Sequence, residues 1–215
     1  SGTQMPSAYG GFDYWKISKN LSWVEYYDCN GSREIMKGFM PKEYPLIHAI
    51  SLGGKVSDQF PRVWHAILHG DSGTLVWPFN GNDTAASLAI DLDGQTIKPS
   101  AKALELAQQF RKLRNGIPVA LKHSAFEKNQ IAVYYSQASI RADWILEVKK
   151  DGKSWLNRSS SWEGGHNYYA SGREGYYKLL EDIGYQYTQI SPDQVENNQI
   201  DKLGIKVIVM PRVIA

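Results

Sequence analysis

Apolar residues along this chain alternate between helical spacing and short continuous runs, and the alternation predicts the order of the elements. The clearest case is residues 61–80. Its helical face is formed by three apolar side chains, Trp64, Ile67 and Leu68. A glycine-containing turn follows, and then the apolar run from Thr74 to Trp77, which Pro78 ends. This stretch predicts a helix, a tight turn and a buried parallel strand.

The same alternation extends over the first half of the chain. It predicts helices over 12–19 and 33–39, strands over 22–27 and 45–51, and a long helix capped by Ser100. This order implies a parallel sheet with right-handed crossovers. A parallel strand needs cover on both faces, and an α/β barrel needs eight strands. We therefore expect residues 1–114 to be the C-terminal half of a (β/α)8 TIM barrel, whose first half would precede this sequence.

A second pattern follows a predicted linker over 115–130, where helical periodicity is lost. Strands are predicted over 131–136, 187–190 and 206–210, and helices over 175–183 and 192–199. This order is typical of the start of a flavodoxin-like doubly wound domain over 131–215, ending at its third strand. Because no glycine-rich fingerprint or phosphate loop follows Ser136, a bound nucleotide is not expected there.

The composition narrows the classes of binding partner that the chain could have. Lysine plus arginine number 24 and aspartate plus glutamate 22, without a basic block, so neither nucleic acid nor an anionic membrane surface is indicated. The 13 tyrosines and 7 tryptophans, many beside polar residues, suit a carbohydrate as well as a protein interface, although aromatic residues more often fill the core. Cys29 is the only cysteine, which excludes an intrachain disulfide. We find no signal peptide or apolar run long enough to span a bilayer, and the compartment stays open between cytoplasmic and secreted bacterial.

In an α/β barrel, residues just past a strand's carboxyl end lie on the face where sites are built. This rule selects Asp28 and Tyr27 after the strand over 22–27, and Trp77 and Asn80 at the end of the strand over 74–77. Asp28 could bind a sugar hydroxyl or act as a catalytic carboxylate; it could also cap the following helix. Trp77 could form the floor under a pyranose ring, or pack in the core.

Weaker candidates lie outside these strand ends. Asp13 could cap a helix, and Trp15 could line the cleft or belong to the core. The stretch 157–175 is too long and irregular for a simple connection. It predicts a lid or subunit contact, or else a flexible surface loop, through three of its side chains, Trp162, His166 and Tyr168.

Histidines give no strong sign of a metal. His65 and His69 have i, i+4 spacing, but no third ligand is evident and Gly70 makes His69 look like a helix terminus. His48, inside a predicted strand, is more typical of a core residue. We expect neither a metal nor a cofactor.

Four segments together resemble the microbial β-galactosidase-like glycoside hydrolases. They are GGFDYWKISKNLSWVEYYD, WHAILHGDSGTLVWPFN, IAVYYSQAS and LLEDIGYQYTQISPDQVENNQI, and they cover nearly the whole chain in order. In that family a catalytic TIM barrel is followed by a flavodoxin-like or amidotransferase-like trimerisation domain. The resemblance implies a retaining hydrolase of β-linked sugars, a homo-oligomer, with an acid and a nucleophilic carboxylate about 5 Å apart.

One departure from the family leaves two functions open. The resemblance places the acid before this sequence and the nucleophile near residues 49–52, where no carboxylate occurs. The chain is therefore expected to be either part of a glycoside hydrolase, with key residues partly outside it, or a non-catalytic carbohydrate-binding or assembly module. An amidotransferase-like enzyme would need a cysteine after the strand over 206–210, and none follows within the sequence.

Overall fold

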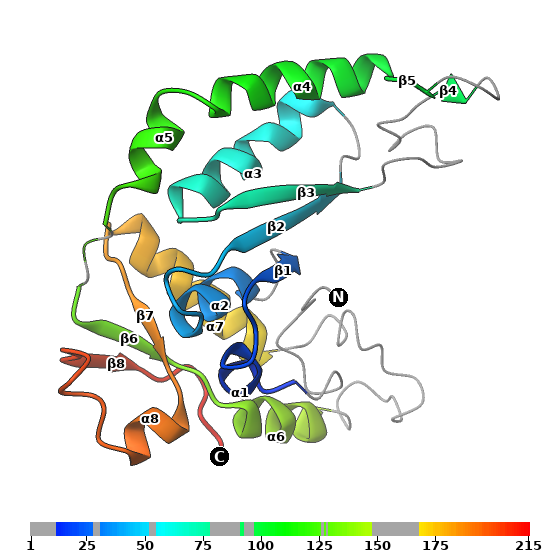
Figure 1. Ribbon diagram of the computed structural model, residues 1–215. Helices are drawn as coiled ribbons and strands as arrows, with labels where there is room; N and C mark the ends of the chain where they lie inside the picture. The colour runs from blue at the N-terminus through cyan, green and yellow to red at the C-terminus, as the bar shows by residue number, and fades with distance from the viewer. Residues whose placement is uncertain are drawn as a thin grey trace. The chain divides into compact units, whose positions relative to one another are not determined.

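The protein is a mixed α/β molecule with small parallel sheets, as the alternating pattern predicts (Figure 1). The computed structural model describes residues 12–27, 31–51, 55–77, 91–92, 97–125, 127, 129–147 and 168–215. Its contacts define two units. We call residues 45–125 the central unit, and residues 1–44 together with 126–215 the outer unit.

The central unit is built on a β-α-β element. Strands β2 (Leu46–Ser51) and β3 (Gly73–Trp77) are parallel, in register from Ile47–Gly73 to Ser51–Trp77, and α3 (Val56–Leu68) connects them. The turn into β3 is fixed by the Ser72 N–H, which donates to the Leu46 carbonyl at 2.9 Å. The predicted helix, turn and parallel strand are thus confirmed over 61–77, although α3 begins five residues before Pro61 and the described side chains of β3 are not buried as predicted.

Helix α4 (Ala101–Leu113) completes the apolar core of this unit. Its predicted cap is confirmed, because the Ser100 hydroxyl accepts from the Ala103 N–H at 3.1 Å. The core consists of five buried side chains, Ile50, Val56, Phe60, Val63 and Leu106. Strands β4 (Asp91–Leu92) and β5 (Ile97–Lys98) form an antiparallel pair.

The predicted linker over 115–130 contains a helix, α5 (Ile117–Lys122). The proline that suggested a break, Pro118, lies in the first turn of α5, where a residue without an N–H costs no helical hydrogen bond. Gly116, at φ 71°, turns the chain into the helix. The prediction of an irregular linker was therefore wrong for residues 117–122.

The outer unit contains a three-stranded parallel sheet with the order β7 (Thr188–Ile190), β6 (Ile131–Tyr134), β8 (Val207–Val209) (Figure 1). Its two faces are covered by separate clusters. Ala132 belongs to one cluster and its neighbour Val133 to the other, as expected from the alternation along a strand. The sheet is therefore buried on both faces, the arrangement expected for parallel strands.

Three helices accompany this sheet: α6 (Gln137–Glu147), α7 (Tyr168–Asp182) and α8 (Pro192–Glu196). Helix α6 was not predicted, because exposed apolar residues at Ile145 and Leu146 blur the helical spacing of the buried Ile140 and Trp144. Helix α7 begins at Tyr168, inside the stretch predicted to be irregular. None of the described helices is long and apolar enough to cross a bilayer.

The N-terminal elements α1 (Tyr14–Ser18), β1 (Val24–Tyr27) and α2 (Ser32–Phe39) belong to the outer unit. Helix α2 packs on β7, where Gly38 lies directly against Gln189. The sequence reading assigned residues 1–114 to one domain, whereas the contacts join residues 1–44 to the C-terminal part of the chain.

Candidate functional site

The sequence predicted site residues at the ends of two strands, β1 in the outer unit and β3 in the central unit. Of these, Asp28 and Asn80 lie outside the described residues, as do Trp162 and His166 of the predicted lid. Trp77 is the last residue of β3, paired in register with Ser51 at the end of β2. Tyr168 is the first residue of α7 rather than part of a loop.

Asp13, Trp15 and Tyr27 make contacts within the outer unit. The Asp13 carboxylate caps α1 by accepting from the Lys16 N–H at 3.2 Å. The Trp15 indole N–H donates to Asp193 Oδ2 at 3.0 Å. The Tyr27 carbonyl accepts a hydrogen bond from the Ser32 hydroxyl, which joins the end of β1 to the start of α2. These contacts give each residue a role in packing or capping.

The two faces of the β2–β3 pair differ. His48 and Ile50 lie two residues apart in β2 and therefore on the same face, and both are nearly fully buried. Ile50 belongs to the core shared with α3. Val76 packs against the same core, whereas its neighbour Leu75 is 37% exposed on the opposite face. Within the central unit, the helices thus cover one face of this pair and leave Leu75 of β3 open on the other.

A second polar cluster, which the sequence reading missed, surrounds the carboxyl end of β6. The Tyr135 hydroxyl donates to Gln137 Oε1 at 2.6 Å and accepts from the Tyr14 N–H at 3.3 Å. Burial raises the pKa of the Tyr135 phenol well above its ordinary value, so the group stays protonated and acts as a hydrogen-bond donor. It ties α1 to the sheet across 121 residues of sequence.

The first turn of α6 binds a backbone segment that follows β8. Ser139 is fully buried, and its hydroxyl accepts from the backbone N–H groups of Ile214 and Ala215 at 3.1 and 3.0 Å. The Asp143 carboxylate, also buried, pairs with Arg212 at 2.6 Å. In doubly wound sheets ligands bind at this carboxyl edge. Here residues 214–215 of the chain itself lie at this edge. The sequence signal for this contact is the pair Ser136 and Ser139, at the end of the strand predicted over 131–136.

A tyrosine cluster lies between α7 and β7. Tyr177 and Tyr187 stack with ring centroids 5.1 Å apart and planes 9° from parallel. Tyr177 donates to Gln189 Oε1, and Tyr187 donates to Glu181 Oε1, both at 3.0 Å. Burial, with the negative charges of Glu34 and Glu181, raises the pKa of Tyr187 far above its ordinary value. The Tyr187 phenol therefore remains neutral, and both tyrosines serve packing and hydrogen bonding.

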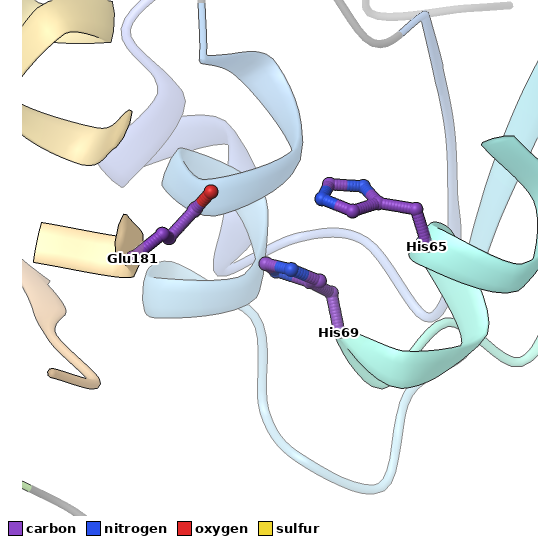
Figure 2. Close-up of side chains that lie close together, drawn as sticks. All are labelled: His65, His69 and Glu181. Carbon is purple, nitrogen blue, oxygen red and sulfur yellow. The ribbon is translucent and has the colours of Figure 1, made fainter. Parts of the chain in front are cut away.

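The last turn of α3 presents the two histidines noted in the sequence. Figure 2 shows the imidazoles of His65 and His69 projecting from this helix one turn apart. Their ring centroids are 4.2 Å apart and the ring planes are inclined by 35°. Glu181, which Figure 2 also labels, belongs to α7 of the outer unit.

Comparison with protein-family models found no match for this chain, and comparison with curated proteins found none.

Proposed function

We propose that this chain is part of a glycoside hydrolase similar to the microbial β-galactosidases. In this proposal β1, β2 and β3 are the last strands of a (β/α)8 barrel, and the sheet β7-β6-β8 begins a flavodoxin-like domain that assembles copies of the protein. The substrate is a β-linked sugar. The other barrel strands would be supplied by a longer chain.

The strand order of the outer unit is the observation that carries the proposal. Its three strands are parallel, and the strand that comes first in the sequence, β6, lies between the second, β7, and the third, β8. This is the start of the 2-1-3-4-5 order of flavodoxin-like sheets. A β-α-β element ahead of a sheet of this order supports the combination of domains that the sequence resemblance implies.

The exposed Leu75 supports the barrel assignment, although Ala49, its register partner on β2, is buried. The inner face of a barrel strand meets side chains from other strands, not helices, and Leu75 faces away from the α3–α4 core. In a barrel Leu75 would be covered by the strands that complete it. Its exposed fraction of 37% is what an incomplete barrel would give.

Within this proposal Asp28 is the carboxylate that we assign to the chemistry, and Trp77 forms a platform for the apolar face of the sugar. A retaining mechanism has two steps. An acid protonates the leaving oxygen while a carboxylate attacks the anomeric carbon, and water then hydrolyses the glycosyl-enzyme. The residue that acts as the acid would come from the barrel strands outside this chain.

Turnover of nitrophenyl β-glycosides by the complete parent protein tests the proposal. Asp28→Asn should lower kcat by roughly 10²–10⁴-fold if the carboxylate takes part in proton transfer or attack. Asp58→Asn, in the exposed first turn of α3, is the matched control and should leave kcat unchanged. Normal turnover by Asp28→Asn would remove Asp28 from the mechanism, and no turnover by the parent would refute hydrolysis.

The absence of a carboxylate at the end of β2, where Ala49 to Ser51 stand, favours one second candidate, a carbohydrate-binding or assembly module without catalysis. Calorimetric titration of the parent with galactose and lactose separates the two. Binding without turnover of any nitrophenyl glycoside would favour the module. Turnover would favour the hydrolase.

A further inference from the structure

The two histidines at the end of α3 have no part in the proposed hydrolase chemistry, yet their geometry is that of a metal chelate. Residues four apart on a helix share one face. His65 is exposed and His69 half-buried, and one ring nitrogen of each lies within 4.8 Å of the other. Figure 2 shows the two imidazoles beside each other on this side of the helix.

We propose that His65 and His69 form a bidentate binding site for a divalent transition-metal ion. Imidazole nitrogen binds zinc at about 2.0–2.1 Å, so two such ligands on one ion lie roughly 3.0–3.4 Å apart. Small rotations of the two side chains bring the nitrogens to that separation from within 4.8 Å. Backbone movement is not required.

The helix holds this pair in place and favours a cation. Val63 and Ala66, on the other side of the same turns, are fully buried, so the last turns of α3 are fixed by packing. His69 is the C-cap, and its N–H lies against the carbonyls of His65, Ala66 and Ile67. The C-terminal end of a helix carries partial negative charge, which stabilises a nearby positive ion.

The ligands determine which ions fit. Imidazole suits zinc, copper and nickel, whereas magnesium and calcium prefer oxygen ligands. Among the divalent ions of the first transition row, copper binds nitrogen sites most tightly. The site therefore selects copper, nickel and zinc over magnesium, and bound water completes the coordination.

Calorimetric titration of the chain with Ni²⁺, and with Mg²⁺ for comparison, tests the proposal. His65→Gln and His69→Gln should each weaken Ni²⁺ binding on the order of a hundredfold, because each removes the gain from binding the second ligand intramolecularly. His123→Gln is the matched control. His123 is the exposed C-cap of α5 in the same unit, and its removal should leave the affinity unchanged.

Electron paramagnetic resonance of the unsubstituted chain with half an equivalent of Cu²⁺ gives a readout that does not depend on the variants. Hyperfine structure from two equivalent imidazole nitrogens, lost in His69→Gln, is the expected result. The proposal is overturned by coupling to a single nitrogen, or by Ni²⁺ affinities that are equal in the parent and in both glutamine variants. An equal loss in His123→Gln would also overturn it.

Discussion

Gly38 of α2 gives the sharpest test of how the N-terminal segment joins the C-terminal sheet. Alanine is a better helix former than glycine, and in an exposed helix the change Gly→Ala stabilises by about 1 kcal/mol. At position 38 we expect the opposite sign. A Cβ there would lie 2.6 and 2.7 Å from the Cγ and Cβ of Gln189, and 2.8 Å from its backbone nitrogen.

These distances set the size of the effect. Carbon atoms in ordinary contact are about 3.5–4.0 Å apart, so α2 and β7 would have to separate by roughly 1 Å. The Gln189 side chain is buried and accepts from Tyr177, and its backbone is part of β7, so neither group moves freely. Overpacking of this kind costs about 1–3 kcal/mol, of which helix propensity offsets about 1. Gly38→Ala should therefore destabilise the protein by up to about 2 kcal/mol.

Urea unfolding followed by circular dichroism measures this change. Gly175→Ala is the matched control, because Gly175 lies inside α7 with no atom within 4 Å of an added Cβ. It should gain roughly 0.5–1 kcal/mol. In thermal unfolding, the two variants should differ in Tm by roughly 2–4 °C for each kcal/mol between them, in a chain of this size. If Gly38→Ala stabilises as much as Gly175→Ala does, α2 does not pack on β7 as described.

Two further predictions concern contacts of the outer unit. Trp15→Phe and Asp193→Ala should each destabilise the protein by about 1 kcal/mol, because each removes the hydrogen bond from the indole N–H to the carboxylate. A double-mutant cycle of urea unfolding should give a coupling energy of about 0.5–1.5 kcal/mol between the two residues. Strictly additive losses would contradict this contact. Because the pKa of Tyr187 is raised in the folded state, its contribution to stability is complete below pH 10 and is lost as the unfolded chain ionises above it. The unfolding midpoint should fall more steeply above pH 10 in the parent than in Tyr187→Phe, and identical slopes would contradict the assignment.

Local sequence signals were reliable for the elements themselves. The Ser100 cap, the strand ending at Trp77 and the order of the strands in the outer unit followed from apolar spacing, caps and glycines. Helix α6 did not, because apolar residues on its exposed face hide the helical period, and the first turns of α7 were not predicted either. Such faces contribute to the pattern in the sequence but not to the core.

For the candidate site, the sequence alone showed less than it did for the helices and strands. The chain order alone selected Asp28 and Trp77, by the rule that strand ends face a barrel site. It could not show that Trp15 donates to Asp193, since the two lie 178 residues apart. Nor could it show that the first turn of α6 binds the backbone of residues 214–215.

The sequence by itself determined the elements, their order and the α/β class, because periodicity, capping and turn chemistry act between residues a few positions apart. Only the tertiary structure decided that the described residues between 12 and 44 pack with the C-terminal part of the chain and that Trp15 donates to Asp193. Those outcomes depend on side-chain shape and burial between surfaces that meet only after folding, such as Gly38 against Gln189. Local periodicity carries no information on that fit.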